Sequence, residues 1–286
     1  MTMDGNGFDL SKARVAIAGL GLMGASLALA LKGKCADLDG VEPQADTREA
    51  ALRLGVVSRA EADPAAILPR ADVIVLAAPL AGILDLLVRL PELAPQACVV
   101  LDLGSSKQVV VEAMAALPER FDPLGGHPVC GKERLSLDNA DAGLYRGAPF
   151  VLTPLPRTTD RARLCAEQVV AGIGARLVWM NADAHDAAIA ASSHLPYLLA
   201  SALALATPPE AAALVGPGFR TTGRLAATPS TMMLSVLESN RANVLAALER
   251  FRTSLGALEA ALRREDSAAL QSHLDRAATL YTELTL

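Results

Sequence analysis

The sequence predicts an α/β fold in which a doubly wound parallel sheet is followed by an all-helical domain. Short apolar runs alternate with helical patterns across residues 1–181, as in parallel strands joined by covering helices. Residues 182–286 show helical spacing of apolar residues and no strand pattern. With 286 residues, the chain is long enough for two domains. We therefore divide it into a sheet domain, residues 1–181, and a helical domain, residues 182–286.

The expected elements of the sheet domain alternate along the chain. The strands are the short apolar runs, which suit a sheet that is buried on both faces. The last two are expected to extend the same sheet. The expected strands are 14–19, 38–42, 72–77, 98–102, 149–153 and 176–180. The expected helices are 23–32, 47–54, a helix from about 81, a helix through 111 and 116, and a helix near 159–172.

The helical domain is rich in Ala and Leu. Helical spacing extends over 184–206, 230–255 and 258–280, with a break or a short helix at 208–217. This apolar content exceeds what a small bundle needs to bury, which indicates a dimer interface. A closely packed monomer core explains the same content equally well.

Charge and composition exclude several classes of function. Lys and Arg number 26 against 31 Asp and Glu, and aromatic residues are only 3%, so the basic patch and stacking rings of a nucleic-acid-binding protein are missing. The same acidic balance disfavours an anionic membrane surface. Four widely spaced cysteines without a Cys-x-x-Cys pair indicate reduced thiols in a cytoplasmic protein.

One uncharged run, residues 15–31, has the composition of a signal peptide or a short membrane span. Three glycines interrupt it, and lysines follow it without a cleavage-like segment. We therefore interpret it as a strand, a turn and a helix. We expect no other stretch to be long enough to span a bilayer.

The first strand leads into a glycine-rich turn that opens a helix. The turn has the Gly-x-Gly-x-x-Gly pattern, in which glycines allow a tight turn, close approach of a pyrophosphate and close helix–strand packing. Glu42 ends the second strand and can bond the ribose hydroxyls of NAD while repelling the 2′-phosphate of NADP. We predict a Rossmann-type domain that prefers NAD to NADP. The expected cofactor-binding residues are Gly19, Leu20, Gly21, Leu22, Met23, Gly24, Glu42, Ala78, Pro79 and Ser105.

Two polar segments follow strands whose ends form the ligand-binding edge of such a sheet. Ser105 lies in Asp-Leu-Gly-Ser-Ser-Lys, and His127 lies in Gly-Gly-His-Pro-Val-Cys-Gly. A histidine in such a loop suits general-base or hydrogen-bond-acceptor chemistry near neutral pH, and Ser105 could hold its ring by a hydrogen bond. A loop histidine bonded to the backbone explains the position equally well.

The helical domain contributes further histidines. His194 lies close to Pro196, which removes one hydrogen bond from a helix, although a histidine that bonds a neighbouring carbonyl is the commoner case. His185 and Asp186 could form part of a metal site. No other ligand cluster has the required spacing, so we expect no metal.

Two arginines, Arg220 and Arg224, lie in a polar segment that also contains glycines. A guanidinium group is suited to bidentate binding of a carboxylate. The segment is therefore a candidate for binding an acidic substrate, while two ordinary surface arginines remain the alternative.

Together the motifs resemble those of prephenate and arogenate dehydrogenases, the oxidoreductases of tyrosine biosynthesis. Five motifs stand in the order found in that family, from about residue 15 to about residue 248. The first is shared by many dehydrogenases, whereas the joint occurrence of the next three is much more specific. The motifs are Gly-Leu-Gly-Leu-Met-Gly, Asp-Leu-Gly-Ser-Ser-Lys, Gly-Gly-His-Pro-Val-Cys-Gly, Ser-His-Leu-Pro and Gly-Phe-Arg-Thr-Thr-Gly-Arg.

The resemblance implies a fold and a reaction. The fold is a Rossmann-type domain followed by a helical dimerisation domain, and hence a homodimer with no nucleic-acid or membrane partner. The reaction is NAD-dependent oxidative decarboxylation of prephenate to 4-hydroxyphenylpyruvate, of arogenate to tyrosine, or of both. Tyr197 stands where many members have a second histidine, so the preference for one substrate stays open.

The resemblance also implies roles for particular residues. His127 accepts the proton or hydrogen bond of the ring hydroxyl, and Ser105 orients His127 and touches the substrate. Arg224 binds a substrate carboxylate, and His194 lines the pocket. The implied substrate-binding residues are Arg224, His194, Ser106, Lys132 and Arg220.

Two alternatives compete with this assignment. Other oxidoreductases with a Rossmann-type and a helical domain, such as hydroxyacid dehydrogenases and imine reductases, generally use a catalytic lysine in the helical domain, and residues 182–286 contain no lysine. A non-catalytic NAD-sensing protein would leave His127, Ser105 and Arg224 without a task.

Overall fold

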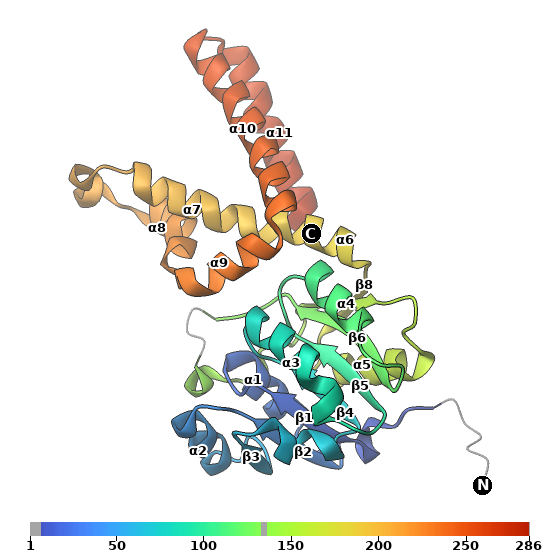
Figure 1. Ribbon diagram of the computed structural model, residues 1–286. Helices are drawn as coiled ribbons and strands as arrows, with labels where there is room; N and C mark the ends of the chain where they lie inside the picture. The colour runs from blue at the N-terminus through green and yellow to red at the C-terminus, as the bar shows by residue number, and fades with distance from the viewer. Residues whose placement is uncertain (1–6, 133–135, 286) are drawn as a thin grey trace.

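The computed structural model describes residues 7–132 and 136–285. Its centre is an eight-stranded sheet in the order β3-β2-β1-β4-β5-β6-β7-β8, in which all neighbours are parallel except β6 and β7 (Figure 1). The carboxyl ends of β1 to β6 therefore meet at one edge, whereas β7 and β8 run in the opposite direction. The strands are β1 Arg14–Ala18, β2 Asp37–Val41, β3 Arg59–Glu61, β4 Val73–Leu76, β5 Cys98–Asp102, β6 Phe121–Pro128, β7 Pro149–Pro154 and β8 Arg176–Trp179.

Helices cover both faces of this sheet. Apolar side chains of α1 and α5 pack with one face in one buried cluster, and those of α3 and α4 pack with the other face in a second. Such two-sided cover explains why the central strands are apolar throughout. The helices are α1 Leu22–Leu31, α2 Ala45–Arg53, α3 Leu80–Leu93, α4 Gln108–Ala115 and α5 Asp160–Gly172, with short 3₁₀ turns at Leu10–Lys12, Pro64–Ala66, Leu68–Arg70 and Leu137–Asn139.

The remaining described residues form a helical region that sits over the carboxyl-end edge of the sheet and sends out two arms (Figure 1). One arm is made by α7 and α8, and the other is the hairpin of α10 and α11. The helices are α6 Ala182–Ile189, α7 Leu195–Ala206, α8 Pro217–Gly223, α9 Ser230–Ser239, α10 Arg241–Arg263 and α11 Ser267–Thr285, with 3₁₀ turns at Pro209–Leu214 and Arg224–Ala227.

A π-helical turn, Ala190–His194, joins α6 to α7. The N–H of Leu195 bonds the carbonyl of Ala190, five residues back. The wider turn lies where Pro196 lacks an N–H to continue the α-helical pattern. The three elements form one helical run, Ala182–Ala206, which is long and apolar enough to cross a membrane by length and composition alone. Our expectation that no stretch beyond 15–31 reaches that length is therefore wrong.

The predicted strands and helices of the sheet domain occur in the predicted order, but the sheet also contains β3 and β6, for which no range was predicted, and β7 and β8 run antiparallel to the other strands. The short strand β3 was not predicted, because three residues give too little pattern to recognise. His127 was placed in a loop after a strand but lies inside β6, where it pairs with Val151 of the antiparallel strand β7. The run 15–31 forms β1, the glycine turn and α1, and most of its side chains are buried in the core.

Candidate active site

The glycine turn after β1 requires glycine at two positions. Gly19 has a φ of +103°, and a Cβ there would lie 2.7 Å from the carbonyl oxygen of Ala77. A Cβ on Gly24 would lie 1.9 Å from the carbonyl oxygen of Gly19. The turn and the start of α1 are therefore packed as closely as a nucleotide-binding turn demands. Gly21 begins α1 without a side-chain cap, which leaves free N–H groups of the helix N-terminus available to a pyrophosphate.

Glu42 lies beside this turn, just beyond the end of β2. Its carboxyl group is buried and accepts hydrogen bonds from the N–H groups of Leu20 (2.9 Å) and Gln44 (3.0 Å). The negative charge is thus fixed next to the glycine turn. Arg48 turns its guanidinium to the carbonyl of Glu42 (2.8 Å). This arrangement fits the ribose of NAD, and the fixed carboxylate opposes a 2′-phosphate.

A buried ion pair fixes the backbone just before His127. Lys107 and Asp102 are fully buried and hydrogen-bonded to each other. Lys107 also donates to the carbonyl of Gly126 (2.6 Å), while Asp102 accepts from the N–H of Gly126 (3.0 Å). Both polar groups of Gly126 are therefore held by one ion pair. Burial lowers the pKa of Lys107, against the opposing effects of Asp102 and Asp186.

His127 follows Gly126 directly, and its ring is positioned by side chains of the helical region. Its Nδ1 lies 2.8 Å from Nε2 of His185, and Nδ1 of His185 lies 2.7 Å from a carboxylate oxygen of Asp186. All three side chains are buried. Burial, together with His185, Lys107 and His194, lowers the pKa of His127 well below its ordinary value. His127 is therefore neutral near pH 7.

Asp186 also joins the two regions of the chain. Its carboxylate accepts hydrogen bonds from the N–H groups of Lys107 (2.8 Å) and Gln108 (3.0 Å), at the N-terminus of α4. It thereby supplies the cap that no residue of α4 provides. Burial raises the pKa of Asp186, but hydrogen bonds from His185, Gln108 and Lys107 outweigh that effect, and the pKa lies below its ordinary value.

His194 is buried at the end of the π-helical turn. Its Nδ1 lies 3.3 Å from the amide nitrogen of Asn240, which also donates to the main-chain carbonyl of Asp186 (2.7 Å). Burial lowers the pKa of His194 to about 4, so it too is neutral near pH 7. Close by, the hydroxyls of Ser106 and Ser239 are 2.7 Å apart and connect the α4 end of the sheet domain to α9.

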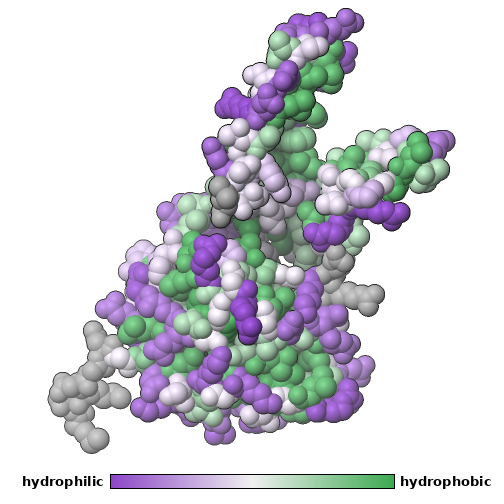
Figure 2. Space-filling view, turned by 180° about the vertical axis from the view of Figure 1, so that it is seen from behind, coloured by the Kyte–Doolittle hydropathy of each residue, from purple (hydrophilic) through white to green (hydrophobic). Residues whose placement is uncertain are grey.

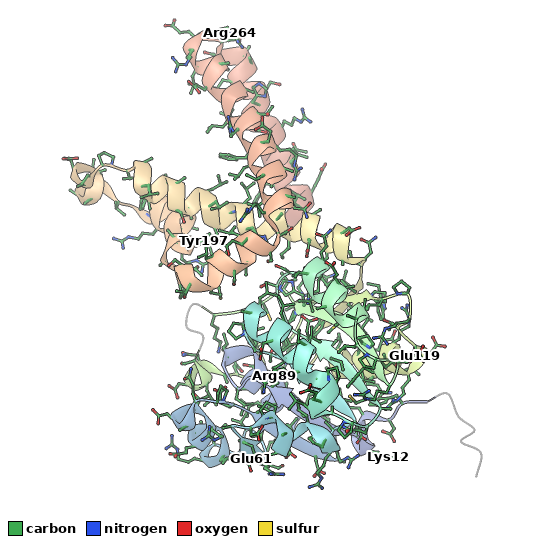
Figure 3. The ribbon with its side chains drawn as sticks, viewed as in Figure 1. Lys12, Glu61, Arg89, Glu119, Tyr197 and Arg264 are labelled. Carbon is green, nitrogen blue, oxygen red and sulfur yellow. The ribbon has the colours of Figure 1, made fainter. Side chains whose placement is uncertain are left out.

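A pocket of about 680 Å³ opens beside these groups. It lies between the loop that follows β6 and the helical region, where Tyr197 marks its α7 side (Figure 3). Two predicted substrate-binding cations, Lys132 and Arg224, line it. Lys132 donates to Asn139 O (2.9 Å) and pairs with Asp141 at 3.3 Å. The lining residues are Gly131, Lys132, Ser192, Ser193, Tyr197, Arg224, Leu225, Thr228, Pro229, Met232 and Met233.

Two residues predicted to bind the substrate or to orient His127 do not make the expected contacts. Ser105 is half-buried between β5 and α4 and makes no hydrogen bond to His127 in the described part of the chain. His185 holds the ring instead, since it already occupies Nδ1. Arg220 is exposed on α8 and does not line the pocket.

The remaining predicted cofactor residues lie at or near the edge where β1 and β4 end. Ala78 and Pro79 follow β4, and Pro79 precedes the first residue of α3. Leu20 and Leu22 are buried in the core next to the glycine turn, and the carbonyl of Met23 accepts a hydrogen bond from Tyr145 (2.6 Å). At Leu20 and Leu22 only backbone groups can therefore face a nucleotide, whereas the Met23 side chain is partly exposed.

Sequence reasoning missed the roles of His185, Asp186 and Asn240. The first two were weighed only as a metal pair, and no group of three or more potential metal ligands occurs among residues 7–132 and 136–285. The adjacent histidine and aspartate at the start of a helix were the available signal. Their partner His127 lies 58 residues away in the sequence, so the fold was needed to join them.

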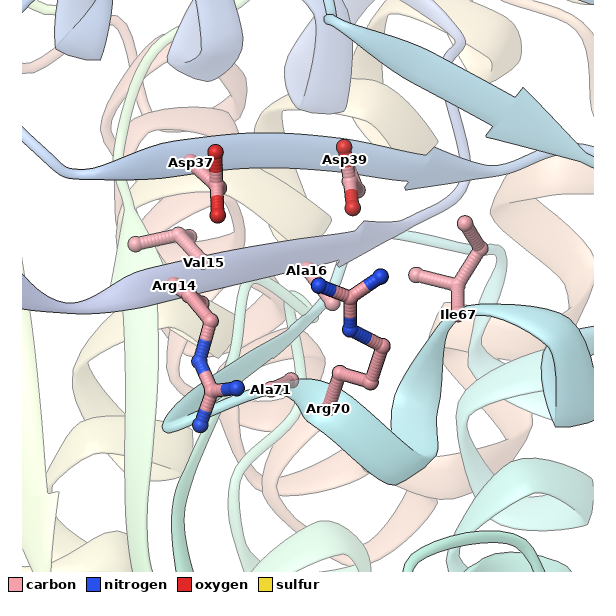
Figure 4. Close-up of a pocket in the computed structure, with 8 residues that line it drawn as sticks. All are labelled: Arg14, Val15, Ala16, Asp37, Asp39, Ile67, Arg70 and Ala71. Atoms are coloured by element: carbon pink, nitrogen blue, oxygen red, sulfur yellow. The ribbon is translucent and has the colours of Figure 1, made fainter.

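A second hollow lies at the other end of the sheet (Figure 4). Arg14 and Asp37 lie at the amino ends of β1 and β2, and Arg70, on a 3₁₀ turn, points toward Ala16 and Asp39. Its volume is about 10 Å³, which is room for about one water molecule. This hollow is therefore too small for a substrate, in contrast to the pocket of about 680 Å³ lined by Lys132 and Arg224.

Comparisons with known proteins agree with this geometry. Residues 27–179 match the family model of the prephenate dehydrogenase nucleotide-binding domain, and residues 181–276 match that of the prephenate dehydrogenase dimerization domain. The chain belongs to the prephenate dehydrogenase family. Membership of that family makes it an NAD-dependent oxidoreductase. The similarity that the sequence motifs suggested is thereby confirmed.

Three relatives illustrate the similarity. A prephenate dehydrogenase of Bacillus subtilis (strain 168) is 30% identical over 275 residues, which cover 91% of this chain and 72% of that protein. Prephenate dehydrogenase from A. aeolicus, solved in complex with hydroxyphenyl propionate and NAD+, is 27% identical with a TM-score of 0.89, over 97% of this chain and 100% of that one. Synechocystis arogenate dehydrogenase is 29% identical with a TM-score of 0.82, over 95% and 100% of the two chains.

Proposed function

We propose that this chain catalyses the NAD-dependent oxidative decarboxylation of prephenate, of arogenate, or of both. The observation that carries the proposal is a buried, neutral histidine whose Nδ1 is occupied and whose Nε2 has no partner among the described residues. It stands at the carboxyl-end edge of the sheet, close to a pocket lined by two cations. Solved structures named for each of the two substrates have similar sequence identity to the chain, 27% and 29%.

The reaction requires one general base from the protein. We assign the base to Nε2 of His127, which takes the proton of the ring hydroxyl as the C–H bond at the same carbon breaks. NAD bound at the glycine turn would supply the acceptor for the hydride released from that carbon. The ring carboxylate then leaves as carbon dioxide, the electron pair of the broken C–C bond completes the aromatic ring, and the phenolate oxygen regains the proton from His127. A base placed in this way accelerates such a step by about 10²–10⁴-fold.

The pocket residues have binding roles in this proposal. Arg224 binds a substrate carboxylate, and Lys132 adds positive charge to the same pocket. His194 is neutral near pH 7 and contributes a hydrogen bond rather than a charge. Ser105, Ser106 and Arg220 stay predictions as substrate contacts. Ser105 lies at the half-buried turn between β5 and α4, and Ser106 lies at the contact between the two regions.

We propose a homodimer formed through the helical domain. Figure 2 shows hydrophobic surface along both projecting arms, and the matched model of residues 181–276 is that of a dimerization domain. Many large apolar side chains of this region are exposed in the single chain, which a second copy would cover. Those on α10 and α11 are Leu245, Leu255, Leu262, Leu274, Leu280, Tyr281 and Leu284.

The domain boundary after residue 181 and the cytoplasmic location complete the proposal. The last strand ends at Trp179 and α6 begins at Ala182, which supports the boundary. All four cysteines are free thiols, which suits a reducing compartment.

The decisive experiment is a turnover assay that follows reduced nicotinamide with each pairing of prephenate or arogenate with NAD or NADP. We expect turnover with NAD, and a His127→Asn variant with kcat at least about 100-fold lower and an unchanged dissociation constant for NAD. His273→Asn, on the exposed face of α11, is the matched control and should retain full activity. Absence of turnover in every pairing would overturn the proposal.

A further inference from the structure

A chain of three buried side chains ends on the proposed base. Asp186 is fully buried, His185 and His127 nearly so. Each neighbour pair in the chain lies within hydrogen-bond distance, at 2.7 Å and 2.8 Å. The rings of His127 and His185 meet edge to face, with 73° between their planes, so one ring directs a nitrogen at the edge of the other.

Asp186, at the acidic end of this hydrogen-bonded series, determines which ring nitrogens carry a proton. Asp186 accepts two main-chain N–H groups at the start of α4 and is therefore an ionised carboxylate. It can only accept from Nδ1 of His185, which must carry the proton. With a single ring proton, held at Nδ1, Nε2 of His185 is then an acceptor. The hydrogen bond to His127 consequently requires a proton on Nδ1 of His127.

The consequence is that Nε2 of His127 carries no proton. A free imidazole distributes its proton over both nitrogens, and one of the two forms could not act as a base at Nε2. The hydrogen bonds select the competent form before any substrate binds. The titratable groups that act on His127 are His185 of α6, Lys107 before α4 and His194 of the π-helical turn. Asp186 pairs with His185, and Asp102 pairs with Lys107.

We propose that His185 is a positioning residue, and that with Asp186 it fixes His127 as the tautomer whose Nε2 is an unprotonated acceptor. This inference rests on the proposed role of His127 as base. It also gives the helical region a task in the chemistry: the base belongs to β6, whereas the groups that set its tautomer belong to α6. The contact between the two regions is thus part of the working site.

The test is ¹⁵N nuclear magnetic resonance of the full-length protein with labelled histidine, without substrate. Long-range couplings report which ring nitrogen of each of the four histidines carries the proton, and the His127→Asn variant assigns the signal. We expect protonated Nδ1 on both His127 and His185. A proton on Nε2 of His127 in the wild type would overturn the proposal without any variant having to fold.

Two substitutions of His185 then separate positioning from packing. His185→Phe fills the same space but offers no acceptor, so His127 should populate both tautomers and kcat should fall about fivefold, in proportion to the lost share of the competent form, with KM nearly unchanged. His185→Gln keeps an acceptor near the position of Nε2 and should restore Nδ1 protonation and kcat to within about twofold of wild type. His273→Phe is the control for the change of residue type.

The outcomes are distinct. Equal losses in His185→Phe and His185→Gln with an unchanged His127 tautomer would assign His185 to packing alone and overturn the inference. The tautomer measurement needs no turnover. Failure of the wild type to oxidise either substrate would therefore count against the proposed function, while an Nδ1-protonated His127 would still support the positioning role.

Discussion

The sheet domain and the helical region differ in how far they bury their apolar side chains. The sheet buries two clusters, one on each face, under helices of its own chain. The arms leave leucines in solvent, and Leu262 is 61% exposed in the single chain. The sheet domain therefore carries its core within itself, whereas the helical region needs a second surface to cover it. The candidate site lies where the two meet and takes groups from both.

The largest effect expected from this contrast is in the buried ion pair of the sheet domain. Lys107→Ala leaves the carboxylate of Asp102 buried without its cation and frees the carbonyl of Gly126. Removing one partner of such a pair costs about 3–5 kcal/mol of unfolding free energy. Urea unfolding followed by circular dichroism measures the loss.

A surface ion pair gives the matched control. Arg89 and Asp85 pair at 3.0 Å on α3 with both side chains largely exposed, and Arg89→Ala should leave the unfolding midpoint nearly unchanged. If Lys107→Ala were as mild as Arg89→Ala, the core of the sheet domain would not set the stability of the chain.

The next effect concerns the arms. Leu255 and Leu262 lie seven residues apart, on one face of α10, and are 51% and 61% exposed. Replacing both by Glu should weaken dimerisation by about 2–3 kcal/mol, roughly 100-fold in the dissociation constant. Sedimentation equilibrium would show the shift toward monomer.

Val88→Glu tests whether replacing any exposed apolar residue by Glu weakens dimerisation. Val88 is 79% exposed on α3 of the sheet domain, and its substitution should leave the association state unchanged. Monomers from Val88→Glu would place the interface on the sheet domain and reverse the contrast, whereas unchanged dimers from the α10 variant would exclude this face of α10 from the interface.

The sequence predicted most of the sheet domain because its signals are local. The glycine turn lies between an apolar strand and a helix, and the order of elements follows from periods of two and of 3.6 residues. What it misplaced depends on distant partners. Gly125, Gly126 and Pro128 are turn-like residues, but pairing with β7 draws them and His127 into a strand. The three residues of β3 form a strand only because β2 lies beside them.

The site was predictable in its composition and not in its connections. His127, His194 and Arg224 were recognised by residue type and motif, and the structure places all three at or beside the contact between the two regions. The partner of His127 was assigned to Ser105, which is near in sequence. Crossing to His185 requires the helical region to lie over the sheet, and no local pattern reports that packing.

A smaller effect is expected from a pair of glycines, one in each region. A Cβ on Gly24 would lie 1.9 Å from the carbonyl of Gly19, whereas one on Gly256 in the exposed face of α10 would meet nothing within 4 Å. Gly24→Ala should destabilise the chain by about 1–3 kcal/mol and weaken NAD binding, because the turn must open. Gly256→Ala should stabilise it by about 0.5–1 kcal/mol, since alanine is the better helix former.

Thermal unfolding and isothermal titration with NAD measure both variants. The contrast predicts opposite signs. A Gly256→Ala variant that lost stability would show that a neighbouring helix, such as one of a second copy, packs closely against that face of α10.

The smallest expected effect is that of a mildly acidic pH on kcat, which should hardly change. His127 is the proposed base, and burial lowers its pKa well below the ordinary value of 6.5, so kcat with saturating substrate should change less than about twofold between about pH 8 and about pH 6. Stability should respond over a lower range. Burial in the folded chain favours the neutral forms of His127 and His194, and it lowers the pKa of His194 to about 4. Below about pH 6.5 the unfolded chain therefore binds more protons than the folded chain. The unfolding free energy consequently falls as the pH decreases from about 6.5 toward about 4. Both shifts require the helical region to cover the edge of the sheet. A kcat profile with its midpoint at pH 6.5 or above would mean that water reaches His127 during turnover, and that the two regions separate in the working enzyme.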